Sequence, residues 1–205
     1  MTAQPAHRRL APEARRELIL GVAVDLFGRR PYAQVSTNDI ARRAGVTRGL
    51  LHHYFGTKRD LYLEVVRRMV LLTLDHELVT PTGPLHVRVD RSVAWFLDVV
   101  SEHGQTYIRV VGAEGVADDP EVERILARAD DVAARVVLAT LGRGDLDDPR
   151  ARAVVRAYGG LVKAAVREWL GAGTLTRQEV HRLLCRALLT VVRDVLPHLP
   201  ERSSA

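Results

Sequence analysis

The sequence of 205 residues contains one cysteine, Cys185, and no two of its eight histidines stand four residues apart. A single thiol cannot close a disulfide within its own chain, which excludes a disulfide-stapled domain and fits a reducing compartment. Two histidines four residues apart are a common way for one helix face to bind a metal ion. We therefore expect no metal site and no cofactor, and we interpret Cys185 as a small core residue.

Long apolar runs are missing as well. The longest candidate, Met69–Leu74, is far shorter than the ~20 apolar residues of a membrane-spanning helix. No basic stretch followed by an apolar one opens the sequence, as it would in a secretory leader. We expect a cytoplasmic protein with no membrane partner.

Motifs of the common enzyme classes are absent. The sequence holds no G-x-S-x-G, and Ser101-Glu102-His103 is contiguous, so its spacing cannot arrange a catalytic triad. The glycines at 171 and 173 follow a predicted helix instead of a strand, which argues against a dinucleotide-binding loop. The paired acids at 118–119 and 147–148 precede prolines at predicted helix starts, where carboxylates stabilise the helix dipole. We predict that the protein is not an enzyme.

A series of short capped helices is present in residues 36–61. Ser36 and Thr47 are good N-cap residues, and each stands at the start of a predicted helix. Gly45 lies between the two helices, where a chain that leaves a helix often takes the left-handed conformation. Helix, glycine turn and helix is the spacing of a helix-turn-helix, whose second helix lies in the DNA major groove.

Basic charge concentrates in the same part of the sequence. Residues 1–68 hold 13 Lys or Arg against 6 Asp or Glu, whereas residues 69–205 hold 17 against 19. A basic segment is the electrostatic footprint of phosphate binding, although an arginine-rich solvated surface is the alternative. Its coincidence with a helix-turn-helix favours DNA.

The segment from Leu18 to Val65, about a quarter of the chain, resembles the DNA-binding domain of the TetR family of bacterial transcriptional regulators. Pro31 departs from the glycine that the family usually has there. The residues that carry the resemblance are Ala23, Leu26-Phe27, Tyr32, Asp39-Ile40-Ala41, Ala44-Gly45-Val46-Thr47, Gly49, Leu51, His53-Tyr54-Phe55, Lys58 and Leu61.

The resemblance implies which residues touch double-stranded operator DNA. The first helix of the pair would hold a phosphate with its N-terminal amides and two hydroxyls, and the second would be the recognition helix. Arg48 can reach a guanine edge or a phosphate, whereas Tyr54 and Lys58 are interpreted as phosphate contacts. The family commonly has a small residue at Leu50 and Tyr at His52. The full set is Ser36, Thr37, Thr47, Arg48, Gly49, Leu50, His52, His53, Tyr54 and Lys58.

The rest of the sequence predicts helices and no strands. We expect an all-α fold of about nine helices, in which a three-helix helix-turn-helix domain precedes a larger helical domain. An apolar stripe runs through the predicted helix 57–78, so the two domains should pack together without a linker. The boundaries are a flexible arm (1–12), a DNA-binding domain (13–60), an effector-binding and dimerisation domain (61–199) and a tail (200–205).

The C-terminal half has few aromatic residues, and each stands on a predicted amphipathic helix. Filling the core is the usual role of such residues. A helical domain joined to a DNA-binding domain commonly encloses an effector site, so we expect a small, largely apolar effector. Its candidate lining, with core or surface packing as the alternative for each residue, is Trp95, Phe96, His103, Tyr107, Arg109 and Tyr158.

The last two predicted helices, about 149–170 and 176–196, are apolar over more than one stripe. A helix buried on one face needs a stripe only slightly wider than ~100°, so the surplus predicts a homodimer through a four-helix bundle. A thicker monomer core is the alternative. The candidate interface residues are Leu161, Ala165, Trp169, Leu184, Leu188 and Val191.

These observations together predict a sequence-specific, DNA-binding transcriptional regulator, more specifically a repressor that an effector releases from its operator. An architectural DNA-binding protein without an effector is the alternative, and a C-terminal half packed solid with no cavity would favour it. A helical enzyme is a third class, but no residues stand out to carry its chemistry.

Overall fold

A computed structural model describes residues 11–74, 82–111, 119–146 and 148–199. The predicted tail and nearly all of the predicted arm lie outside the described residues. Within the described part all regular structure is helical, with α1 to α8 and short 3₁₀ and π segments, which confirms the all-α class. No helix in these ranges is long and apolar enough to cross a membrane.

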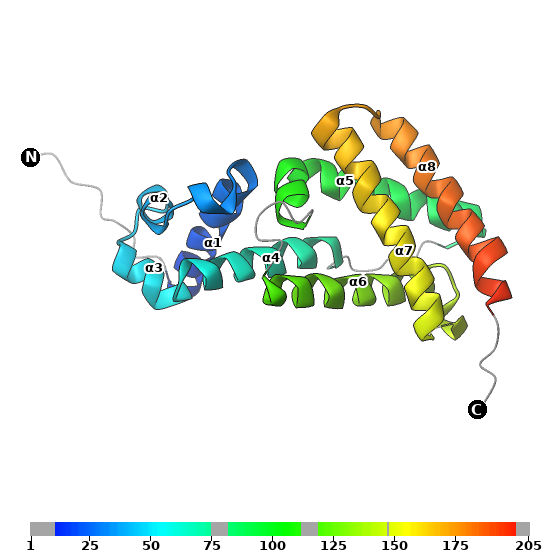
Figure 1. The fold of residues 1–205 in the computed structure, drawn as a ribbon, viewed down its shortest axis with the longest axis horizontal. Coiled ribbons are helices and arrows are strands. Elements are labelled where there is room, and N and C mark those ends of the chain that lie inside the picture. Colours follow the sequence, from blue (N-terminus) through cyan, green and yellow to red (C-terminus); the bar gives the residue numbers. More distant parts are fainter. Residues whose placement is uncertain (1–10, 75–81, 112–118, 147, 200–205) are drawn as a thin grey trace, which may run out of the picture.

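Helices α1 (Pro12–Arg29), α2 (Thr37–Arg43) and α3 (Arg48–Phe55) form one end of the molecule, with the 3₁₀ turn η1 (Tyr32–Gln34) after α1 (Figure 1). Ser36 Oγ accepts a hydrogen bond from the backbone N–H of Asp39 at 3.0 Å. Thr47 Oγ1 accepts one from the N–H of Leu50 at 3.2 Å. Gly45 has a φ of 64°, in the left-handed region that strains any side chain. The predicted helix-turn-helix is confirmed.

Helix α4 (Lys58–Leu74) runs from the end of α3 into the middle of the molecule, beside α6 (Pro120–Thr140) (Figure 1). Leu61, Val65 and Met69 are at most 1% exposed. They belong to one apolar core that α1 to α4 share with side chains of α5, α6 and α7. The N-terminal domain therefore packs directly against the rest of the chain.

Helices α5 (Leu85–Val111), α6, α7 (Pro149–Val166) and α8 (Arg177–Thr190) enclose a second core. Leu97, Leu138 and Leu184 are at most 1% exposed within it. Helices α7 and α8 pack on each other, and α8 also packs along α5 (Figure 1). Short segments complete the domain: η2 (Gly144–Leu146), η3 (Arg167–Ala172), η4 (Val191–Val195) and η5 (Leu196–His198).

Two contacts join the N-terminal helices to α5 and α6. A Cβ atom at Gly28 in α1 would lie 2.0 Å from Oγ1 of Thr106 in α5, so the approach of these helices requires a residue without a side chain.

Arg59, at the start of α4, donates to both carboxylate oxygens of Asp119, from Nε at 2.6 Å and from Nη2 at 2.8 Å. Asp119 is the N-cap of α6 and also accepts from the N–H of Glu121 at 2.9 Å. The hydrogen bond from Arg59, followed by that from Glu121, lowers the pKa of Asp119 to about 2.

Because the pKa of Asp119 is lowered in the folded protein, its contribution to the free energy of unfolding should depend on pH. A carboxylate whose folded-state pKa lies below its unfolded value stabilises the fold at all pH values above the unfolded value of about 4, and less as the pH falls. We expect Asp119→Asn to lower the free energy of unfolding at neutral pH, and the difference from wild type to shrink as the pH falls from about 4 towards about 2. Urea unfolding at several pH values measures it.

The matched control for this measurement is Asp145→Asn. Asp145 is an exposed carboxylate whose oxygen lies 3.8 Å from Nε of Arg143, so its loss should change stability little at any pH. A difference between wild type and Asp119→Asn that stayed constant down to the lowest pH would remove the ion pair as its cause.

Candidate nucleic-acid interface and effector cavity

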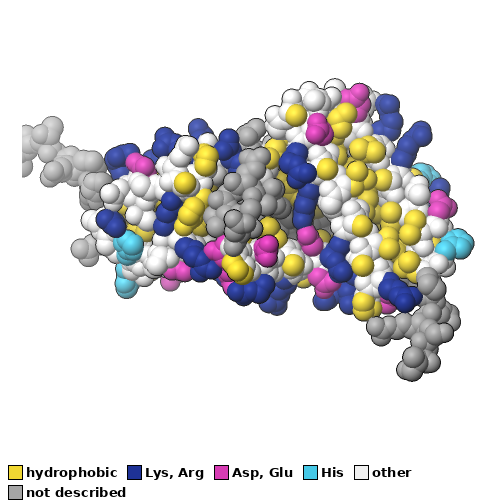
Figure 2. Space-filling view, in the orientation of Figure 1, with side chains coloured by type: hydrophobic (Ala, Val, Ile, Leu, Met, Phe, Trp, Pro, Cys, Tyr) yellow, Lys and Arg dark blue, Asp and Glu magenta, His cyan; other side chains and the backbone are white. Residues whose placement is uncertain are grey.

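The outer surface of α3 carries the residues expected at DNA. Arg48, Gly49, His52 and His53 are exposed, Leu50 and Tyr54 are half-buried, and histidine side chains are visible at the end of the molecule where α3 lies (Figure 2). The opposite face of α3 is anchored by Leu51 and Phe55, which are 0% and 6% exposed. This alternation gives α3 one face in the core and one face free for a groove.

Arg48 and His52 contact each other on this face. Nε of Arg48 donates to Nε2 of His52 at 3.4 Å, and Nδ1 of the same ring lies 2.5 Å from the carbonyl oxygen of Gly56. A neutral imidazole protonated at Nδ1 satisfies both contacts, because it donates to the carbonyl and accepts from the guanidinium. No carboxylate among the described residues forms an ion pair with Arg48, so its charge faces solvent.

Lys58 has a structural contact that sequence reasoning did not foresee. Its ammonium donates to the backbone carbonyl of Tyr32 at 2.6 Å and lies 4.1 Å from the centre of the Tyr32 ring. Desolvation by burial lowers the pKa of Lys58. An ammonium has three donors, so the predicted phosphate contact remains possible for the other two and stays a prediction.

The N-terminus of α2 is partly occupied by its own cap. The hydroxyl of Ser36 donates to the carboxylate of Asp39 at 2.9 Å, and that carboxylate pairs with Arg42 at 2.5 Å. The hydrogen bond from Ser36 is the first cause that lowers the pKa of Asp39. A phosphate arriving at Ser36 and Thr37 would meet this negative charge, so their predicted contact depends on rearrangement of the cap.

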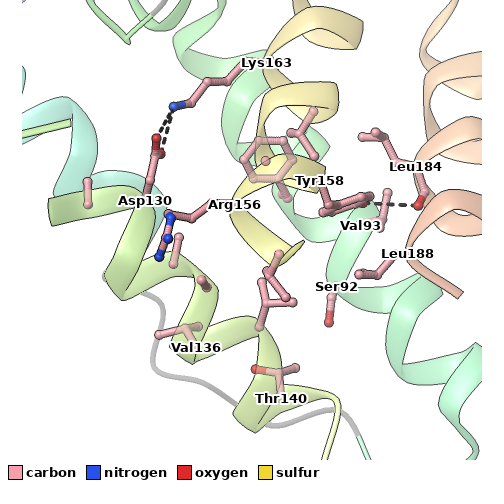
Figure 3. Close-up of a pocket in the computed structure, with 18 of the residues that line it drawn as sticks. Ser92, Val93, Asp130, Val136, Thr140, Arg156, Tyr158, Lys163, Leu184 and Leu188 are labelled. Atoms are coloured by element: carbon pink, nitrogen blue, oxygen red, sulfur yellow. Dashed lines mark hydrogen bonds and ion pairs between the residues drawn. The ribbon is translucent and has the colours of Figure 1, made fainter. Parts of the chain in front are cut away.

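A cavity of about 390 Å³ lies between the helices of the C-terminal half, which is in the size range of sites for small molecules (Figure 3). Trp95, Phe96, Tyr107 and Tyr158 line it, as expected, whereas His103 and Arg109 are not among the lining residues. Nδ1 of His103 instead lies 3.1 Å from the carbonyl oxygen of Val99, one turn earlier in its own helix. Four of the six candidates therefore come together around one space.

The wall of the cavity is apolar, with few polar groups. Nζ of Lys163 in α7 pairs with the carboxylate of Asp130 in α6 at 2.6 and 2.8 Å, and Tyr158 donates to the carbonyl of Leu184 at 3.2 Å (Figure 3). Burial raises the pKa of both Tyr107 and Tyr158, so both hydroxyls are neutral hydrogen-bonding groups at physiological pH. Sequence reasoning missed Asp130 and Lys163. The available signal was a charge among apolar residues on a helix face, because Asp130 shares its face with Leu126, Ala133 and Ala134.

The candidate dimer residues do not share one surface. Ala165, Leu184 and Leu188 are at most 3% exposed within a single chain, and the two leucines line the cavity, so their assignment to an interface is corrected. Trp169 and Val191 are half-buried, and Leu161 is exposed. The apolar stripe that contains Leu184 faces inward. Hydrophobic side chains are visible on the outer surface over α7 and α8 (Figure 2). The large hydrophobic residues that are exposed in this part of the chain, Leu161, Leu183 and Val195, define its outer stripe.

Comparison with known proteins gives one family along the chain. Residues 19–65 match the family model described as bacterial regulatory proteins, tetR family. Residues 85–191, just over half of the chain, match the model of a tetracyclin repressor-like C-terminal domain.

Two curated proteins and a crystal structure are similar over long stretches. The HTH-type transcriptional activator FasR of Mycolicibacterium smegmatis is 27% identical over 165 residues, which are 79% of this chain and 75% of that protein. An HTH-type transcriptional repressor of Mycobacterium tuberculosis is 46% identical over 115 residues, which are 54% of this chain and 56% of that protein. The crystal structure of a TetR-family regulator from Streptomyces coelicolor has a TM-score of 0.74 at 28% identity and covers 95% of this chain and 94% of its own.

The matches cover both the helix-turn-helix and the helical half that holds the cavity, and the capped α2–α3 pair has the geometry that such a domain needs. The chain belongs to the TetR family of DNA-binding transcriptional regulators, which are not enzymes.

Proposed function

We propose that the protein is a repressor that binds a roughly palindromic operator as a homodimer and is released by a small, largely apolar effector. The observation that carries this proposal is the cavity of about 390 Å³. One wall of the cavity is formed by α6, whose N-cap residue Asp119 pairs with Arg59 at the start of α4. The described C-terminal helices enclose a cavity and do not form a solid core. This argues against a purely architectural DNA-binding protein, for which a solid core was expected.

DNA recognition is assigned to the exposed face of α3. Arg48 is the side chain there that can donate two hydrogen bonds to a guanine edge in the major groove. A Cβ atom at Gly49 would meet open space, so packing inside the protein does not require a glycine there. The missing side chain would instead allow the helix backbone to approach DNA closely. His53 and Tyr54 lie beside these residues and would approach the phosphate backbone of the DNA. In a dimer, two such faces one or more helical turns apart would match an operator with two half-sites.

Release by the effector would act through α6. This helix supplies the longest wall of the cavity, from Leu126 to Leu141, and its first turn is tied to α4 through Asp119 and Arg59. Val70 of α4 also lines the cavity. An effector that binds one spacing of α6 and α4 better than another shifts the population of the dimer by that difference in affinity. Among the relatives one is named an activator and another a repressor. Transcription from the operator measured with and without the protein would decide the direction of control.

Replacement of Arg48 tests the recognition helix. We expect Arg48→Ala to weaken operator binding by ~1–3 kcal/mol and to leave binding to scrambled DNA nearly unchanged, because a base contact discriminates between sequences. Fluorescence anisotropy with the promoter nearest the gene, at two salt concentrations, measures both affinities. Arg182→Ala is the charge-matched control, since Arg182 is an exposed residue of α8. An equal loss on both DNAs would make Arg48 a phosphate contact.

A cavity-filling change tests the effector site. Gly159 lines the cavity, and a Cβ atom there would meet no atom within 4 Å, so a larger side chain can enter the space without a clash at its root. We expect Gly159→Leu to weaken binding of anilinonaphthalene sulfonate, an aromatic dye with one sulfonate group, at least tenfold, or about 1.4 kcal/mol. Operator affinity without the dye should stay the same.

Gly159→Ala is the control for this test, because it adds helix propensity and leaves most of the space open. Equal dye affinity in wild type and both variants, measured by fluorescence titration, would place the dye outside the cavity and remove this support for an effector.

A change on the outer stripe of α7 and α8 tests the dimer. Leu161 and Leu183 are 37% and 41% exposed in one chain. In a two-fold interface each substitution occurs twice, and an unpaired buried charge costs roughly 2 kcal/mol or more per copy. We expect Leu183→Glu to give monomers by light scattering and to weaken operator binding. Leu71→Glu is the control, because Leu71 is 55% exposed on α4. Intact dimers of both Leu161→Glu and Leu183→Glu would remove this face as the interface.

A further inference from the structure

Three side chains with metal-binding atoms meet between α5 and α8, outside the DNA-binding face and outside the cavity lining. They are Asp90 of α5 and His181 and Cys185 of α8. Nε2 of His181 lies 3.4 Å from Oδ1 of Asp90 and 3.7 Å from Sγ of Cys185. All three ligand atoms lie within 4.8 Å of one another. The expectation of no metal site rested on the absence of histidine pairs and on the interpretation of the lone Cys185 as a core residue, and it overlooked the four-residue spacing of His181 and Cys185.

The two separations from His181 fit a tetrahedral zinc ion. Zinc binds sulfur at about 2.3 Å, histidine nitrogen at about 2.0–2.1 Å and carboxylate oxygen at about 2.0–2.2 Å. At tetrahedral angles these lengths place nitrogen and sulfur about 3.6 Å apart, and nitrogen and oxygen about 3.3 Å apart. The distances from His181 to Cys185 and to Asp90 are both within about 0.1 Å of these values. Binding therefore needs little movement of the imidazole relative to either partner.

The surroundings suit a partly open metal site. His181 and Cys185 are half-buried against the second core, whereas the side chain of Asp90 is 63% exposed. The two α8 ligands are thus held by packing, and the α5 carboxylate can close on the ion from the solvent side. Three protein ligands leave one position of the tetrahedron for water or another group. A cysteine binds zinc as the thiolate, so metal binding would release the thiol proton of Cys185.

We propose that Asp90, His181 and Cys185 form a Zn²⁺ site that clamps α5 to α8. A thiolate, an imidazole and a carboxylate together favour zinc over Mg²⁺ or Ca²⁺, which prefer oxygen ligands. Directly beside these ligands, Ser92 of α5 and Leu184 of α8 line the cavity, so the ion fixes the spacing of two of its walls. The three ligands belong neither to the cavity lining nor to the residues assigned to DNA.

Cobalt substitution tests the site with the full-length chain. Co²⁺ bound by a thiolate gives a charge-transfer band in the near ultraviolet, and tetrahedral Co²⁺ gives intense visible bands that Zn²⁺ then abolishes. We expect both bands in wild type at one Co²⁺ per chain. Cys185→Ser should lose the charge-transfer band, and His181→Ala and Asp90→Asn should each weaken Co²⁺ binding at least tenfold. Zinc should also raise the melting temperature of wild type, because an ion that binds only the folded chain stabilises it.

Asp98→Asn is the matched control. Asp98 is another exposed carboxylate of α5 that faces α8, but it pairs with Arg177 instead of a metal ligand. This variant should keep the bands, the stoichiometry and the shift in melting temperature. The absence of a charge-transfer band in folded wild type would overturn the proposal, as would binding at half an ion per chain through cysteines of two molecules. Retention of wild-type affinity by both His181→Ala and Asp90→Asn would overturn it as well.

Discussion

The burial of α4 in a core common to both domains is the constraint on which the rest of the molecule depends. Leu61, Val65 and Met69 contact one continuous set of apolar side chains that reaches from α1 to α7. Close-packed interiors resist small displacements, so the recognition helix cannot turn freely against the C-terminal helices. The contact of Gly28 with Thr106 adds a second fixed point, because no side chain fits there to act as a flexible spacer. A change in the spacing of α5 and α6 therefore has to move α1 and α4 as well.

The ion pair of Arg59 and Asp119 connects α6 to the start of α4, close to the recognition helix. Asp119 accepts hydrogen bonds from the guanidinium of Arg59 and from the first turn of α6, so the start of α6 and the start of α4 share one carboxylate. Lys58, the neighbour of Arg59, donates to the carbonyl of Tyr32 in η1, the turn that follows α1. Two consecutive residues thus connect α6 and η1 to the turn that follows α3. Displacement of α6 by an effector would reach the recognition helix within one helical turn of its end.

What the sequence predicted correctly depends on contacts within four residues. The caps at Ser36 and Thr47 and the left-handed Gly45 follow from local hydrogen bonding, and the structure has all three. Contacts between distant residues were missed, because no local rule brings Arg59 to Asp119 or Lys163 to Asp130. Four of the six cavity candidates were predicted correctly because large aromatic residues that pack in a core also line the cavities in it. Three of the six interface candidates, Ala165, Leu184 and Leu188, are buried within one chain, since periodicity cannot say which of two apolar stripes faces inward.

Helix α8 brings these cases together, because its three faces have three different neighbours. Successive residues turn by about 100°, so Leu184, Leu183 and Cys185 point in well-separated directions. Leu184 lines the cavity, Leu183 lies on the exposed outer stripe, and Cys185 stands with His181 opposite Asp90 of α5. An effector, a second protein chain and a metal ion would each act on one face of the same rigid element. Any one of them that shifted α8 would change the surface offered to the other two, so the three proposed equilibria would be coupled through a single helix.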